Sequence, residues 1–212
     1  FGETGGNINL MVNGLMVNAA NFSNLSNTIL GGAKVLVLMG GSGNGKGELL
    51  IDGQGSPIDS FGIGGQELWI DHICALADDV PNQGVDCVEF EELTLGTIYT
   101  VGNSFAVSDA TGTLTFDVLA EGFEWENGTV TTAGSATVEA GGLAGHFGNE
   151  MEVNNINLKF VPTSDKPYGL SILFGETGGN INLMVNGLMV NAANFSNLSN
   201  TILGGAKVLV LM

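Results

Sequence analysis

The stretch NINLMVNGLMVNA, residues 7–19, indicates the fold class of this 212-residue chain. Aliphatic side chains recur at every second position on both sides of Asn13-Gly14, as they do on half-buried β-strands. Asn-Gly is the dipeptide that a two-residue type I′ turn favours, because both central residues of that turn have positive φ. The stretch therefore predicts a β-hairpin.

The hairpin belongs to a segment that occurs twice. Residues 1–39 and 174–212 are identical, at an offset of 173 residues. Repetition at a fixed period is typical of repeat proteins. Two explanations are open at this point. The chain is a window on a longer tandem array with a 173-residue period, or its duplicated ends are exchange segments that each fit into a neighbouring subunit.

The composition is that of a folded but strongly acidic protein. Hydrophobic residues make up 44% of the chain and charged residues 13%, which argues against disorder. Acidic residues number 22 against five basic ones, a net charge of −17. A nucleic-acid-binding protein needs a basic surface, and an anionic membrane repels an acidic one. No apolar run reaches the roughly 20 residues of a membrane helix. Divalent cations, water and neutral sugars remain as partners.

Short alternating segments without a helical period fill the rest of the chain. They include GTIYTVGNSFAV from Gly96, GTLTFDVLA from Gly112 and SATVEA from Ser135, separated by glycine-rich turns. We predict an all-β fold, an antiparallel β-sandwich of the jelly-roll type, repeated every 173 residues.

The polar stretch at 75–86 indicates a linker between repeat units, with Pro81 inside it and a cysteine on each side. Residues 1–74 would then form the C-terminal part of one unit and residues 87–212 the N-terminal part of the next.

Four motifs carry a resemblance to known proteins. A unit that opens with CVEFEEL and LGTIYTVGNSF, continues with AGGLAGHFGNEMEVNN and closes with FGIGGQELWIDHIC resembles the glycine-rich β-sandwich tandem repeats of very large secreted bacterial surface and fibre proteins. Its two terminal strands also resemble those of carbohydrate-binding jelly rolls, which open with a Glu-x-Glu strand and close on an aromatic strand that bears an Asp. The resemblance implies an extracellular or cell-surface location.

Cys74 and Cys87 are the only cysteines, and in a secreted protein they would be oxidised. Two pairings are open. A Cys74–Cys87 bond would staple the linker. Alternatively, Cys87 pairs with the equivalent of Cys74 one period later, which the resemblance favours because both cysteines lie at the edges of one unit.

A calcium site is expected at the start of the unit. Alternation along VEFEEL would put Glu89 and Glu91 on one strand face, and Asp71 lies on the closing strand. Hard oxygen ligands from adjacent strands suit calcium, and the resemblance to carbohydrate-binding jelly rolls implies an ion there. The alternative is that these carboxylates are solvated surface charges. No other cofactor is expected.

Aromatic and histidine residues give weaker signals. Trp69 and Trp125 are the candidates for stacking on a sugar, although aromatic side chains more often face a core. His72 is expected to be packed or at the surface, and His146 lies in a glycine-rich turn. Because no Ser-His-Asp or zinc-ligand spacing is present, we find no catalytic constellation and expect no enzyme.

The stretch GGSGNGKG, residues 40–47, is expected to be a turn rather than a phosphate-binding loop. Gly47 follows Lys46 where such a loop has Ser or Thr, and ELLIDG behind it indicates a strand instead of a helix.

These observations predict a structural subunit or repeat of an extracellular filament, surface layer or adhesin stalk. Its partners would be copies of itself, joined through strand edges or by strand exchange. The residues expected at these contacts are the aliphatic positions of the repeated segment, namely Ile8, Leu10, Val12, Leu15, Val17, Val35, Val37, Ile181, Leu183, Val185, Val208 and Val210. The alternative function is a calcium-dependent, lectin-like module that binds glycans.

Overall fold

The computed structural model describes residues 6–19, 25, 28–39, 45–76, 86–186, 188–192, 202–203 and 206–210. Within these ranges the regular structure is β and contains no α-helix, as the composition predicted. No described helix is long and apolar enough to cross a membrane.

Over the described residues, eighteen strands form one hydrogen-bonded sheet network. The strands of the first half are β1 (Gly6–Val12), β2 (Gly14–Ala19), β3 (Ile29–Leu30), β4 (Ala33–Met39), β5 (Gly45–Asp52), β6 (Phe61–Leu76), β7 (Cys87–Val88), β8 (Ile98–Thr100) and β9 (Ser104–Ser108). Those of the second half are β10 (Thr115–Glu124), β11 (Val130–Thr131), β12 (Ser135–Ala140), β13 (Asn149–Asn154), β14 (Ile156–Pro162), β15 (Gly169–Asn186), β16 (Leu188–Ala192), β17 (Ile202–Leu203) and β18 (Ala206–Val210).

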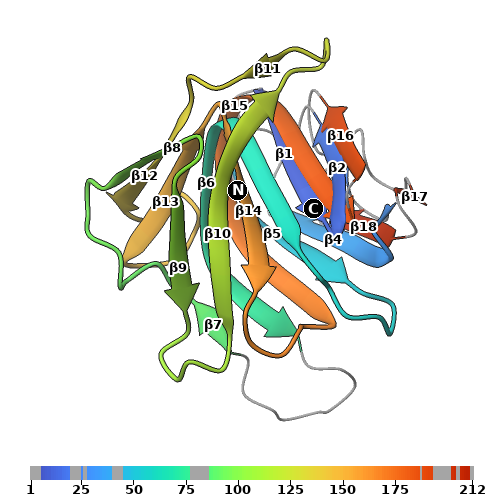
Figure 1. Cartoon of the computed structure of the whole chain (residues 1–212), viewed down its shortest axis with the longest axis horizontal. Coiled ribbons are helices and arrows are strands. Elements are labelled where there is room, and N and C mark those ends of the chain that lie inside the picture. The colour runs from blue at the N-terminus through green and yellow to red at the C-terminus, as the bar shows by residue number, and fades with distance from the viewer. Residues whose placement is uncertain are drawn as a thin grey trace.

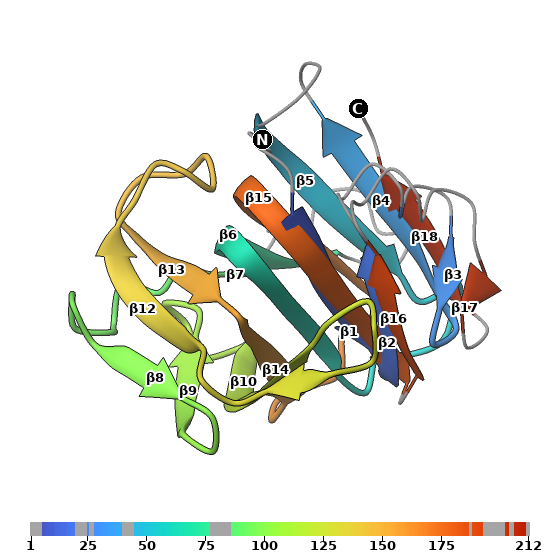
Figure 2. The same cartoon turned by 90° about the horizontal axis from the view of Figure 1, so that it is seen from above.

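Two long strands, β6 and β15, lie at the centre of the network (Figure 1). In Figure 2 the group β8, β9, β12 and β13 lies to one side of them, and β3, β4, β17 and β18 lie to the other. Residues 61–65 of β6 pair with β14 and with β1. Its later residues pair with β15, β13 and β7. β6 therefore connects parts of the chain from both sides of the predicted linker.

Strand β6 continues through Leu76, so the first two residues of the predicted linker belong to a strand. Residues 77–85 lie outside the described part of the chain. The turn expected at 40–47 is described only from Gly45 onward, where β5 begins. Strand β5 contains the ELLID segment that was predicted to be a strand.

The sheet is mixed, so the prediction of a purely antiparallel arrangement is wrong. Among the described pairings, strands within one 173-residue period pair antiparallel. The parallel pairings are β1–β15, β16–β2 and β17–β3. Each of these places a residue opposite its identical counterpart 173 positions away, for example Ile8 opposite Ile181. Parallel pairing therefore arises only between the two copies of the repeated segment.

The turn predicted at Asn13-Gly14 is confirmed by its backbone, with φ of 51° and 79° at these two residues. The hairpin pairing itself is described in the second copy, between β15 and β16, whereas the described registers pair β2 with β15 and β16 rather than with β1. Positive φ at both central positions is the mark of a type I′ turn. The Asn13 side chain also donates a 2.7 Å hydrogen bond to the Gly31 carbonyl, which ties this turn to the β3–β4 turn.

Aromatic residues fill the centre of the core. Phe61 of β6 stacks on Phe160 of β14 with ring centroids 4.6 Å apart, and Phe116 of β10 meets both rings edge-on. All three side chains are fully buried. Because β6 pairs with β14 and β14 with β10, this cluster fixes the three strands against one another.

Candidate metal centre

A β-bulge in the central strand positions the first two residues of the site. Ile73 lies opposite Ile172, yet Asp71 lies opposite Leu173, so His72 is an extra residue on β6. His72 has φ of 51°, a left-handed conformation that is uncommon for a residue other than glycine. Bulges bend a strand locally and redirect side chains, and this one leaves Asp71 fully buried while His72 reaches partly into solvent.

The disulfide brings the third residue alongside. Cys74 and Cys87 are bonded, which is one of the two pairings that the sequence left open. The short strand β7 pairs with β6 through Val88 opposite Ile73, and Glu89 follows directly. Cross-strand pairing and the covalent bond together hold Glu89 beside His72.

The fourth residue comes from the glycine-rich turn between β12 and β13. Here the buried Glu150 carboxylate accepts backbone hydrogen bonds from Gly142, Leu143 and Ala144 at 3.1, 3.1 and 2.8 Å. The turn also rests on β15, where a Cβ on Gly175 would lie 2.1 Å from the Leu143 carbonyl oxygen. Anchored at this end, the turn places His146 over β6.

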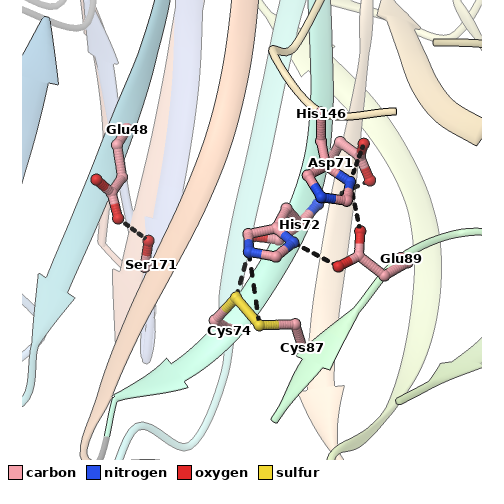
Figure 3. The surroundings of a disulfide bond; sticks show 8 residues. All are labelled: Glu48, Asp71, His72, Cys74, Cys87, Glu89, His146 and Ser171. Atoms are coloured by element: carbon pink, nitrogen blue, oxygen red, sulfur yellow. Dashed lines mark hydrogen bonds and ion pairs between the residues drawn. A yellow bond between two sulfur atoms is a disulfide. The ribbon is translucent and has the colours of Figure 1, made fainter. Parts of the chain in front are cut away.

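The four side chains converge on one point (Figure 3). The imidazole rings of His72 and His146 stack with centroids 4.5 Å apart. His72 Nδ1 contacts Glu89 Oε1, and His146 Nδ1 lies 3.2 Å from Glu89 Oε2. One donor atom from each of His72, Glu89 and His146 lies within 4.8 Å of the other two.

Asp71 lies behind these three residues. Its Oδ2 is 3.9 Å from His146 Nδ1, and its Oδ1 accepts a 2.7 Å hydrogen bond from the His72 backbone N–H. Burial is the main cause that raises the pKa of Asp71 to about 7; the His72 hydrogen bond opposes this rise, and the nearby carboxylates of Glu89, Glu150 and Glu91 add to it. A proton or a cation nearby would relieve the cost of this buried charge.

Three atoms of the cluster lack a hydrogen-bond partner although they are buried. They are Asp71 Oδ2, Glu89 Oε2 and His146 Nδ1. The 3.2 Å contact between the last two atoms has an ion-pair distance but not the geometry of a hydrogen bond. Buried polar atoms normally have a partner, so these three converge on a position that suits a ligand.

The predicted calcium ligands are only partly brought together. Asp71 and Glu89 both approach His146, as described above. The expectation that Glu89 and Glu91 share a strand face is wrong, because β7 ends at Val88 and the chain turns over the next residues. Glu91 is exposed, and its Oε1 accepts a 2.8 Å hydrogen bond from the Asn149 backbone. It stabilises the start of β13 from there.

An acidic pocket of about 480 Å³ opens next to the cluster. Its lining residues are Cys87, Glu89, Glu91, Glu92, Ser108, Asp109 and Ala110. Glu89 thus faces both the histidines and a surface of negative potential, which raises the local concentration of cations.

The two predicted sugar-stacking residues are both half-buried. Trp69 Nε1 donates a 3.1 Å hydrogen bond to Glu139 Oε2. Trp125 packs edge-on against the buried Phe123, with ring centroids 5.3 Å apart. Each indole thus has a contact partner within the chain itself.

The predicted assembly residues belong mainly to the core. Eight of them are buried within this chain, namely Ile8, Leu10, Val12, Leu15, Val17, Val35, Ile181 and Leu183. The side chains of Val37, Val185, Val208 and Val210 lie outside the described part. Both copies of the repeated segment therefore contribute to the same sheet rather than to a separate apolar surface.

The sequence interpretation missed the two histidines as a pair. They lie 74 positions apart, and neither has a ligand motif around it. His72 adjoins Asp71, which the sequence did select, so a search around the predicted ligands could have found it. Nothing local marks His146, because its position depends on how the turn is anchored by Glu150.

The chain matches no protein-family model, and neither the curated proteins nor the solved structures contain a significant match to it.

Proposed function

We propose that this chain is a non-enzymatic structural module that joins copies of itself through its repeated 39-residue segment. Units in such an assembly, on one polypeptide or on several, would exchange this segment as interchangeable strands. A filament, surface layer or adhesin stalk outside the cell is the setting that this function implies.

The pairing of β5 is the observation that carries the proposal. A strand has two hydrogen-bonding edges, and β15 pairs with β5 along residues 45–52. Residues 49–51 also pair with residues 35–37 of β4 and with residues 208–210 of β18. β18 lies alongside β4 in Figure 2. Because 208–210 is the identical copy of 35–37, the two strands are alternative partners for the one remaining edge.

Strands β15 and β16 also pair with equivalent residues of both copies. Asn182 of β15 pairs with Asn191 of its own hairpin and also with Asn18, the counterpart of Asn191 in the first copy. Asn9, the counterpart of Asn182, likewise pairs with Asn191. Equivalent residues of the two copies thus pair with the same partner residue in the same register. This is the requirement for exchange between identical segments.

The position beside β6 also has two candidates. β15 follows β6 as far as Gly178, opposite Glu67, and then leaves it. β1 pairs with the next residues of β6, where Ile8 lies opposite Gly65. If β15 continued along β6, its Ile181, the counterpart of Ile8, would come within one residue of the position opposite Gly65. One unit therefore needs a single copy of the segment here, and the second copy can serve a neighbouring unit.

Two further features support the finer parts of the proposal. The first strand after the predicted linker, β7, pairs with the closing strand β6, as terminal strands often do in a jelly-roll sandwich. The Cys74–Cys87 disulfide suits an oxidising compartment such as the cell exterior.

Proline substitutions in each copy test the exchange. The Val35 N–H donates to the Thr28 carbonyl, so alternation turns the N–H of Leu36 toward β5. Leu36→Pro removes this donor from β4, and Leu209→Pro does the same in β18. We expect the unfolding temperature of each single variant to stay within a few degrees of that of the parent chain. The double variant should lose about 3 kcal/mol or more of unfolding free energy.

The matched control is Leu50→Pro in β5, which has no second copy and should destabilise the fold alone. The parent chain should form oligomers whose size grows with concentration in sedimentation velocity, whereas both single variants should stay monomeric. If Leu36→Pro alone were as damaging as the double change, the two copies would not be interchangeable. A parent chain that stayed monomeric at every concentration would disprove the assembly function.

A further inference from the structure

The cluster around His146 has the composition of a transition-metal site rather than of a calcium site. Calcium takes six to eight oxygen ligands, whereas imidazole nitrogen combined with carboxylate oxygen suits zinc and its neighbours in the first transition row. Two imidazoles and one carboxylate converge here, and a second carboxylate lies behind them. We propose that His72, His146 and Glu89 bind one divalent transition-metal ion of the zinc class.

The spacing of the donor atoms fits such an ion. Zinc–ligand bonds of about 2.0–2.1 Å in a tetrahedron place neighbouring donor atoms about 3.3 Å apart. His146 Nδ1 and Glu89 Oε2 are 3.2 Å apart, and Asp71 Oδ2 lies 3.9 Å from the same nitrogen. The His72 donor atom lies within 4.8 Å of those of Glu89 and His146, so side-chain shifts of about 1–2 Å would complete a four-coordinate shell with Asp71 as the fourth donor.

The unpartnered atoms are a second and independent indication. Asp71 is fully buried, and its Oδ2 has no hydrogen-bond partner although it points toward His146. An ion at the centre would satisfy Asp71 Oδ2, Glu89 Oε2 and His146 Nδ1 together. Glu89, His72 and His146 each remain partly exposed, so an ion can enter from solvent.

The surroundings already hold the ligands in place. The bulge and the disulfide fix His72 and Glu89, and Glu150 anchors the turn that carries His146, as described above. Metal sites depend on such supporting contacts as well as on the ligands themselves. None of the four side chains of this site lies in the repeated segment.

Metal titration of the full chain tests the proposal. Cobalt(II) reports the geometry of a zinc site through its visible absorption, and competition with zinc gives the affinity. The titrations omit reductant, because the Cys87 sulfur lies 3.7 Å from His72 Nε2 and a reduced thiolate there would bind zinc itself. We expect one cobalt ion per chain, with tetrahedral bands that zinc abolishes, at micromolar dissociation constants or tighter.

Two variants separate this site from the calcium alternative. His146→Gln, in a turn that Glu150 anchors independently, should weaken zinc binding about 100-fold or more. Glu91→Gln changes the carboxylate that accepts a hydrogen bond from the Asn149 backbone, and it should alter the zinc affinity by less than about threefold. Absence of cobalt or zinc binding at about 1 mM would overturn the proposal. So would an unchanged zinc affinity in His146→Gln, or calcium binding that is tighter than zinc binding and is lost in Glu91→Gln.

Discussion

At the scale of single residues, Asp109 illustrates how one carboxylate organises a turn. It is buried between β9 and β10 and accepts hydrogen bonds from the Leu114 N–H at 2.8 Å, the Thr113 hydroxyl at 3.0 Å and both the N–H and the hydroxyl of Thr111. Burial raises the pKa of Asp109, but these hydrogen bonds outweigh it and lower the pKa to about 2. The folded state therefore favours the ionised form.

This shift predicts a pH-dependent contribution to stability. Because the pKa of Asp109 is lower in the folded state, ionised Asp109 stabilises the protein at pH values above its unfolded-state pKa of about 4. This contribution disappears as the pH falls toward 2. Asp109→Asn should cost about 1–2 kcal/mol at pH 6 in urea unfolding, with a difference from the parent that shrinks between pH 4 and pH 2. A difference that stays constant over this range would contradict the assignment.

Gly64 of β6 is a second residue whose identity the packing dictates. A Cβ at this position would lie 2.0 Å from Asn157 Oδ1 and 2.4 Å from the Ile156 carbonyl oxygen. Gly64→Ala should therefore push β14 away from β6 and destabilise the fold by about 3 kcal/mol. Gly128→Ala is the comparison, because it meets open space and costs only the strain of its φ of 77°, about 1 kcal/mol. Equal losses in thermal unfolding would show that close approach at Gly64 is unimportant.

At the scale of elements, buried and half-buried asparagines set the register between strands. Asn9 of β1 donates a 2.8 Å hydrogen bond to Asn157 of β14, and Asn18 of β2 donates a 2.6 Å bond to Asn9. Asn191 of β16 donates a 3.0 Å bond to Asn182 of β15. Because a shifted strand would leave these buried amides unpaired, the network favours one alignment over its neighbours.

Asn157 is the member of this network that has no second copy, so its substitution gives a clear test. Its side-chain amide also donates a 2.6 Å hydrogen bond to the Gly122 carbonyl in β10. Asn157→Leu leaves that carbonyl and the Asn9 amide unsatisfied, and we expect a loss of about 2–4 kcal/mol in denaturant unfolding. Asn127→Ala in an exposed turn is the control and should cost less than about 1 kcal/mol. If Asn157→Leu were neutral, the network would not determine the register.

The sequence predicted elements better than it predicted the site. Local patterns were sufficient for the Asn13-Gly14 turn and for β5, because turn chemistry and alternation are properties of neighbouring residues. They failed at Glu89, where an alternating segment continues past the end of β7. They also failed at His72, since the bulge depends on the register between β6 and β15. The metal centre combines three separate segments, and only tertiary structure brings those together.

At the scale of the whole molecule, the net charge acts against assembly. The chain carries −17 at pH 7, and units that exchange strands must approach closely. Repulsion between like-charged surfaces acts over the Debye length, which is about 10 Å at 0.1 M salt and about 3 Å at 1 M. Backbone pairing between identical segments is much less sensitive to salt, because it relies on hydrogen bonds and apolar contact. Salt therefore alters the repulsive contribution alone.

We accordingly expect association of the parent chain to strengthen as salt is added. Refolding from denaturant at a fixed protein concentration should give a larger oligomeric fraction in about 500 mM NaCl than in about 20 mM, as measured by sedimentation velocity. Leu209→Pro, with only one usable copy at the β5 edge, should stay monomeric at both salt concentrations. Oligomers that dissociated as salt was added would contradict this expectation, because contacts weakened by salt are held by charge pairs. In that case the repeated segment would not be what joins one unit to the next.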